Sequence, residues 1–166
     1  MNEYHATPYD ISAAGFYFKT YEEYLEKAAH HTNDYGDKVE EFEIQFIDGD
    51  NYELFKALSI SQANLELWFD DYEDLDGDEL IRAIYLAQHI GYDADDILHR
   101  LDDIYLFEGS AQEYAEQYLE DTGLLNEIPD HLQFYFDVER FANDMLLGGD
   151  ITEVTIQNTR YIAQES

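Results

Sequence analysis

The stretch EFEIQFIDGD at residues 41–50 alternates apolar and polar side chains and ends in an Asp-Gly pair. Phe42, Ile44 and Phe46 fall on one face, and the residues between them are charged or polar. A period of two is typical of a half-buried strand, and an Asp-Gly pair is typical of the turn that ends one. We therefore predict a strand here, with one face packed against a core.

The residues before this strand predict a small mixed unit. GFYF at 15–18 is a short aromatic strand candidate, and TYEEYLEKAAHH follows it. In that segment Thr20 and Glu23 have the spacing of a capping box, which opens a helix. Residues 1–50 are therefore predicted to form an N-terminal α+β subdomain.

Beyond residue 50 the apolar spacing becomes helical. Leu80, Ile84 and Ala87 fall on one helical stripe, Gly91 suits a helix C-cap, and Asp93 suits the N-cap of the next helix. Residues 51–103 are therefore predicted to form a central helical subdomain.

Strand and helix signals alternate again in residues 104–166. IYLF at 104–107 is a strand candidate, and Ser110 with Glu113 predicts a helix that ends at Gly123. Asp137 suits an N-cap, and the final apolar stretch predicts a hairpin that turns at residues 157–159. This third subdomain is α+β, and so is the fold class of the whole chain.

Composition separates this chain from both disordered acidic tails and nucleic-acid binders. It has 39 Asp and Glu against 8 Lys and Arg, a formal charge of -31, yet 45% of its 166 residues are hydrophobic and 16% aromatic. Such a chain can bury a core. The bases are scattered singly, so we expect neither direct nucleic-acid binding nor attraction to an anionic membrane. The absence of Cys, of a leader and of a long apolar run predicts a cytoplasmic protein.

The acidic residues gather in several stretches with no base to offset them. WFDDYEDLDGDEL at 68–80 is the densest, and like-charge neighbours of this kind destabilise a helix. Charge distributed in this way predicts a surface that meets a cationic partner. We call the predicted members the acidic set: Asp70, Asp71, Glu73, Asp74, Asp76, Asp78, Glu79, Asp93, Asp95, Asp96, Asp102, Asp103, Glu113, Glu116, Glu120 and Asp121.

A calcium loop is the obvious alternative for the densest stretch. Asp74, Asp76 and Gly77 match three EF-hand positions, but that register puts Tyr72 at the first ligand and Ala83 at the closing Glu. We therefore predict no metal site. The chain also lacks the sequence motifs of hydrolases, P-loop proteins, dinucleotide-binding proteins and zinc proteases, so no catalytic residue and no cofactor is predicted.

The amount of charge suits a particular kind of partner. B-DNA carries one charge per roughly 1.7 Å of axis, so the net charge of this chain matches about 53 Å of duplex, or around 15 base pairs. A folded surface of that density could occupy the basic cleft of a DNA-binding enzyme.

Residues 113–150 resemble the ArdA antirestriction family. The matching elements are the acidic helix that ends in Glu120, Asp121, Thr122 and Gly123, the Ile128-Pro129 helix start, Leu132, Tyr135 to Asp137, Phe141, Ala142 and Asp144. EEFEIQFIDG and ATPYDISAAGFYF also look like the family, although its common opening, an Asn-Leu-Gly-like strand, is replaced here by ATPYDISAAG.

The resemblance implies a DNA mimic of mobile elements or phages, built as three small subdomains in a row, that occupies the DNA-binding groove of type I restriction-modification enzymes. It also implies an elongated homodimer that associates through the C-terminal subdomain. On this basis the expected interface residues are Ile128, Leu132, Tyr135, Phe136 and Phe141.

Two other readings are compatible with the charge. A DNA mimic directed at another system, such as an anti-CRISPR protein or an antagonist of histone-like proteins, would share the same electrostatics. A housekeeping protein of a halophile would also be acidic and poor in Lys, with the charge serving its folding in concentrated salt.

Overall fold

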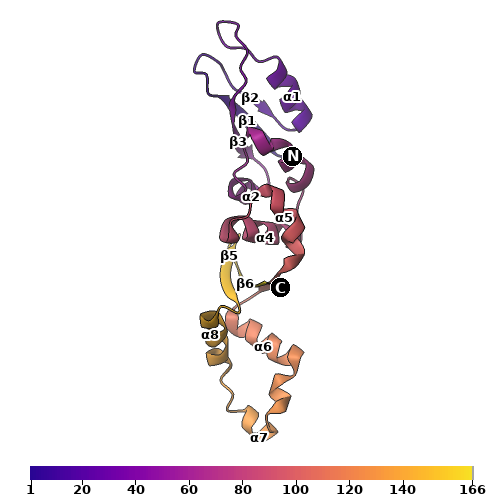
Figure 1. Ribbon diagram of the computed structural model, residues 1–166, viewed down its shortest axis with the longest axis vertical. Helices are drawn as coiled ribbons and strands as arrows, with labels where there is room; N and C mark the ends of the chain where they lie inside the picture. The colour runs from indigo at the N-terminus through magenta and orange to yellow at the C-terminus, as the bar shows by residue number, and fades with distance from the viewer. Residues whose placement is uncertain (166) are drawn as a thin grey trace. The chain divides into compact units, whose positions relative to one another are not determined.

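A computed structural model describes residues 1–165, which divide into two compact units between His99 and Arg100. Both units combine helices with a small antiparallel sheet, so the predicted α+β class is confirmed (Figure 1). The further division of the chain into three subdomains, at residues 50 and 103, stays a prediction.

The first sheet has the strand order β2-β1-β3, so the earliest strand is the middle one (Figure 1). Its strands are β1 (Glu3–Pro8), β2 (Phe16–Phe18) and β3 (Phe42–Asp48). The predicted strands β2 and β3 are confirmed, and β3 buries Phe42 and Ile44 as its alternation indicated. β1 was not predicted. Its Tyr4 lies opposite Phe18 on one side and Phe46 on the other, so this strand joins the two expected ones.

Helix α1 (Tyr21–Ala29) begins where the capping box predicts. The Thr20 hydroxyl accepts a hydrogen bond from the Glu23 backbone N–H at 3.1 Å. The Glu23 carboxylate bonds the Lys19 N–H, at 3.1 Å, instead of the N–H of Thr20. One orphan donor at the start of the helix is therefore satisfied as expected, whereas Glu23 binds the N–H one residue before the position that a capping box would use.

The segment after β3 is helical, as predicted, but two of its helices end in π-turns. The elements are α2 (Tyr52–Ala57), η1 (Gln62–Asn64), α3 (Leu65–Leu67), the π-helix η2 (Trp68–Tyr72), α4 (Gly77–Tyr85), the π-helix η3 (Leu86–Ile90), α5 (Ala94–Ile97) and η4 (Leu98–Asp103). The predicted stripe of Leu80, Ile84 and Ala87 is buried, and Gly91 is a left-handed C-cap. Asp93 occupies the N-cap of α5 without a side-chain hydrogen bond.

Aromatic side chains fill the core of the first unit. Tyr4, Phe18 and Trp68 are each 0% exposed, and the rings of Tyr4 and Phe18 stack with their centroids 5.4 Å apart. Phe69 meets the Tyr4 ring edge-on at 5.2 Å. The π-helix η2 therefore packs against β1, the middle strand of the first sheet.

The second sheet has the order β4-β6-β5, with β4 (Ile104–Glu108), β5 (Thr152–Ile156) and β6 (Thr159–Glu165). The predicted hairpin is confirmed. Gln157 and Asn158 form its two-residue turn with φ of 51° and 65°, which is the type I′ geometry that matches strand twist. β6 pairs with both other strands and is therefore central.

The helices of the second unit are α6 (Ala111–Thr122), η5 (Leu124–Glu127), α7 (Asp130–Gln133) and α8 (Val138–Gly148). Ser110, Gly123 and Asp137 cap them as predicted, and the Asp137 carboxylate accepts from the Arg140 N–H at 3.0 Å. α6 and α8 lie side by side (Figure 1) and bury a core that includes Tyr114, Ala115, Ala142, Ile151 and Ile162.

Candidate functional site

Exposed carboxylates are the candidate functional groups of this chain. Every member of the acidic set except Glu73 is exposed. Pairs between Lys27 and Glu23 at 2.8 Å and between Arg160 and Glu153 at 3.9 Å are seen, and neither involves a member of the set. Exposed carboxylates of the set therefore lie in the helical part of the first unit, at Asp102 and Asp103 near the start of the second, and on α6.

Glu73 departs from the rest of the acidic set because it is tied to the core. The Tyr4 hydroxyl donates a hydrogen bond to its carboxylate at 2.6 Å. The same hydroxyl accepts from the indole N–H of Trp68 at 2.8 Å and from the Asn2 amide at 3.2 Å. Partial burial raises the pKa of Glu73, and the hydrogen bond from Tyr4 opposes that rise. Glu73 therefore anchors the acidic loop to β1.

The π-turn of η2 orients the two carboxylates that precede this anchor. The Glu73 backbone N–H donates to the Trp68 carbonyl, five residues back, at 2.8 Å. Within that turn Trp68 and Tyr72 are both fully buried, whereas Asp70 and Asp71 are exposed. The turn thus separates the segment into a buried aromatic side and an acidic side that faces water.

Some of the acidic residues have a structural explanation in helix dipoles. Asp78 and Glu79 lie in the first turn of α4, and Asp95 and Asp96 lie in the first turn of α5. The N-terminal end of a helix carries partial positive charge, so carboxylates there are stabilising. These four residues would suit the fold even if they had no partner.

The acidic residues toward the end of α6 have no such explanation. Glu120 and Asp121 lie in its last turn, just before the C-cap Gly123, and no basic residue stands in that turn. Carboxylates at this end oppose the helix dipole, and Glu116 and Glu120 repel each other at i, i+4. Asp121 is partly compensated because Gln117, four residues earlier, donates a hydrogen bond to it at 2.9 Å. Among the described residues, Glu116 and Glu120 have no such compensation. Charge that costs the fold stability is evidence of a use outside the fold.

The acidic residues do not assemble a metal centre. Within residues 1–165, no three His, Asp or Glu side chains gather closely enough to hold a metal ion. The acidic set is therefore spread out and does not converge on one ion in the described part of the chain.

The expected interface residues fall into two groups in the second unit. Leu132 is 45% exposed and Tyr135 is 78% exposed. Ile128 and Phe136 are half-buried, and Phe141 is half-buried against the core of the unit. Leu132 and Tyr135 are therefore the predicted residues with the most apolar surface to offer a partner.

The most exposed apolar residues of the second unit were not predicted. Phe134 is 89% exposed and meets the Tyr135 ring edge-on at 5.6 Å, and Leu147 near the end of α8 is 87% exposed. Three consecutive aromatic residues at 134–136 were the available signal. The sequence could not show that Phe134 and Tyr135 face water while Phe136 is half-buried, because the directions of these side chains depend on where α7 ends.

Within the described residues no helix is both long and apolar enough to cross a membrane.

Comparison with known proteins identifies a family. No curated protein matches the chain. A family model described as "Antirestriction protein (ArdA)" matches residues 10–158, which is most of the sequence.

Proposed function

The chain belongs to the ArdA family of antirestriction proteins, and from this premise we propose that it occupies the DNA-binding groove of a type I restriction-modification enzyme by imitating DNA phosphates. Membership gives it an antirestriction function and a restriction enzyme as partner. The family is one of inhibitors, so the expected activity is binding without catalysis.

The position of charge on α6 is the observation that carries the proposal. Glu120 and Asp121 oppose the dipole of their own helix, and Glu116 adds a repulsive neighbour. All three are exposed. A cationic groove would convert this repulsion into attraction, because its Lys and Arg side chains supply the counter-charge that the helix lacks.

The proposed mechanism is competition with DNA. Carboxylates of the acidic set replace phosphates against basic side chains of the enzyme, and both surfaces release the counterions they hold. Binding should therefore weaken steeply as salt rises.

Binding to a purified type I methyltransferase core tests this mechanism. The dissociation constant would be measured across a salt series, with a DNA duplex as competitor. Tight, salt-sensitive binding that duplex displaces is the expected result. Absence of binding at low salt by folded protein would remove the restriction enzyme as target. A screen of other DNA-binding systems, including CRISPR effectors and histone-like proteins, would then be the next measurement.

The distributed nature of the surface has its own test. Single Asp→Asn changes within residues 70–79 should weaken binding slightly, and neutralising the whole stretch should weaken it much more. Loss of inhibition from one exposed carboxylate alone would contradict a distributed phosphate mimic. Glu73 is left unchanged in these variants because it is bonded to Tyr4.

Salt dependence of folding separates this proposal from a halophile's housekeeping protein. A mimic should show its full circular dichroism spectrum in dilute buffer. A spectrum that develops only in molar salt would indicate that the acidic charge serves folding instead.

We also propose that the chain forms a homodimer through the second unit. Support comes from the apolar side chains of Leu132, Phe134 and Tyr135, which are exposed close together in sequence. Light scattering coupled to size exclusion gives the mass of the particle in solution. Replacing Phe134 and Tyr135 with Ala should yield a monomer, and an unchanged dimer mass would place the interface elsewhere.

A further inference from the structure

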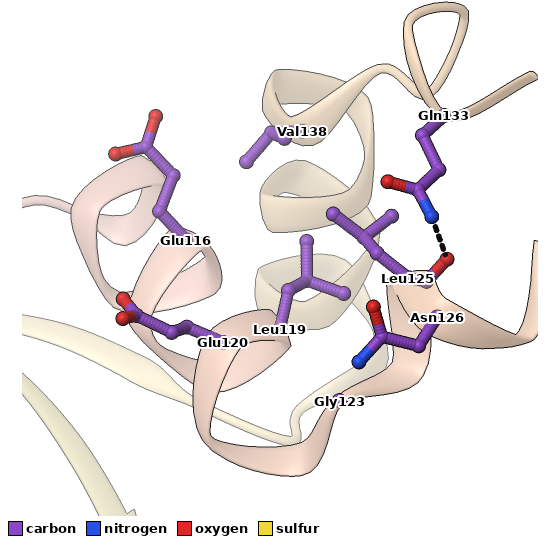
Figure 2. A pocket seen from close by; sticks show the side chains of 8 residues that line it. All are labelled: Glu116, Leu119, Glu120, Gly123, Leu125, Asn126, Gln133 and Val138. Carbon is purple, nitrogen blue, oxygen red and sulfur yellow. Dashed lines mark hydrogen bonds between the residues drawn. The ribbon is translucent and has the colours of Figure 1, made fainter. Parts of the chain in front are cut away.

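A cavity of about 360 Å³ opens on the second unit, where the end of α6 meets η5, α7 and the start of α8 (Figure 2). All the residues that line it belong to this one unit. Its floor is apolar, one of its walls carries carboxylates, and the opposite wall carries an amide.

The floor of the cavity is apolar. Leu119 is buried, Leu125 is half-buried, and Val138 packs against the core of the unit. A floor of this kind favours an aliphatic chain, because burying CH₂ groups on it removes apolar surface from water.

One wall carries Glu116 and Glu120, one helical turn apart on α6 (Figure 2). Neither carboxylate makes a hydrogen bond or ion pair with another side chain of residues 1–165. The other two acids of the helix are engaged: Ser110 donates to Glu113 at 3.2 Å, and Gln117 donates to Asp121 at 2.9 Å. The two carboxylates at the cavity are thus the two that lack a partner.

The opposite wall contributes an acceptor of fixed orientation. The Gln133 amide nitrogen donates to the Leu125 carbonyl at 2.8 Å and to the Ile128 carbonyl at 3.1 Å. Carbonyl oxygens only accept, so the nitrogen must face them and the amide oxygen must point the other way. Figure 2 shows that oxygen on the side away from the Leu125 carbonyl.

We propose that this cavity binds one arginine side chain of the restriction enzyme. Its aliphatic stem would lie on Leu119, Leu125 and Val138. Its guanidinium would lie between the carboxylates of one wall and the Gln133 oxygen of the other. The inference rests on the proposed function for the source of the arginine, but the chemistry of the cavity stands apart from it.

Arginine fits these walls better than other cations do. Its planar guanidinium carries five N–H donors and can reach acceptors on two sides, whereas a Lys ammonium is a compact, strongly hydrated point charge. A divalent ion is disfavoured because two carboxylates give too few ligands for Ca²⁺. A phosphate mimic built from charge alone would need no apolar floor, so the cavity adds a preference for side-chain shape.

The first test uses a small probe and no enzyme. N-acetyl-arginine amide is titrated into the full chain while the methyl resonances of Leu119, Leu125 and Val138 are followed by NMR. Saturable shifts are expected, with smaller shifts from N-acetyl-lysine amide or CaCl₂. The double change Glu116→Gln with Glu120→Gln should remove them. Unmoved methyl resonances, or equal shifts with the lysine probe, would overturn the assignment.

The second test uses the methyltransferase core and a control with the same charge. Glu108→Gln with Glu139→Gln also removes two exposed carboxylates from this unit, at positions that do not line the cavity. The cavity variant should bind the core about tenfold more weakly than this control, which corresponds to about 1.4 kcal/mol. Equal weakening of the two variants would show that only the number of charges matters.

A third variant fills the cavity without changing charge. Asn126 is exposed and lines the cavity, so Asn126→Phe should leave the fold intact and still weaken binding to the core. Circular dichroism checks the fold, and unweakened binding by folded protein would count against the proposal. Probe binding without enzyme binding would keep the cavity and reject the target. Binding of the methyltransferase core by a chain whose cavity does not respond to the arginine probe would keep the restriction enzyme as target and reject the cavity as an arginine site.

Discussion

Neutralising Glu120 should make the protein more stable while it makes the inhibitor weaker. The residue lies in the last turn of α6, where its charge opposes the helix dipole. Replacing it with Gln removes that unfavourable interaction, about 0.3–1 kcal/mol, and its i, i+4 repulsion with Glu116, about 0.2–0.5 kcal/mol. Gln and Glu have similar helix propensity. The free energy of unfolding should therefore rise by about 0.5–1.5 kcal/mol at low ionic strength.

Glu113 is the matched control because it stands in the first turn of the same helix. The change Glu113→Gln loses a favourable dipole interaction of about 0.3–1 kcal/mol and relieves an i, i+3 repulsion with Glu116 of about 0.2–0.5 kcal/mol. Its effect should be near zero or slightly destabilising. The two variants have the same net charge, so their stabilities should differ by about 1 kcal/mol through position alone.

Urea unfolding followed by circular dichroism at pH 7 and low salt measures this difference. It should shrink in 1 M NaCl, where charges are screened within about 3 Å. A Glu113→Gln protein as stable as Glu120→Gln would refute the dipole reasoning. It would also remove the observation on which the proposed function rests.

Three other changes test contacts described above. Tyr4→Phe should destabilise the protein by about 1–3 kcal/mol in urea unfolding, because it leaves the buried Trp68 N–H without its acceptor; a change below about 0.5 kcal/mol would show that this network is not stabilising. Glu73 has a raised pKa in the folded state, so its contribution to stability is fully present below its ordinary value of 4.5 and is lost as pH rises through the raised value. Glu73→Gln should therefore gain stability relative to the unaltered protein between pH 4 and pH 7, and parallel pH profiles would contradict this. Asp137→Ala should cost about 1 kcal/mol by removing the cap on the Arg140 N–H, and an unshifted melting temperature would show that the cap is replaced by water.

Local sequence rules predicted those parts of the fold that depend on neighbouring residues. Ser110 and Asp137 are caps because their side chains reach N–H groups three residues away, and Asn158 supports a turn that its own backbone conformation defines. Strand β1 escaped prediction because it ends at Pro8 and gains its place only from partners later in the chain.

The candidate site was predictable to a similar degree. Exposure of nearly all of the acidic set followed from composition and spacing. Glu73 did not, because its partner Tyr4 lies 69 residues away, and nothing in a run of acids marks the one that turns inward. The cavity beside α6 was equally invisible, since it depends on the Gln133 amide being held by two backbone carbonyls across a loop.

The strand orders of the two sheets have a consequence for biosynthesis. In the first sheet the middle strand is made first, so β2 can pair with β1 as soon as it leaves the ribosome. In the second sheet the middle strand is made last, and β4 stays an unpaired edge until β6 arrives. The first sheet is thus built from its middle strand toward its edges, and the second sheet is built from its edge strands toward its middle strand. α6, which follows β4, acquires its supporting sheet only at the final step of synthesis of this unit.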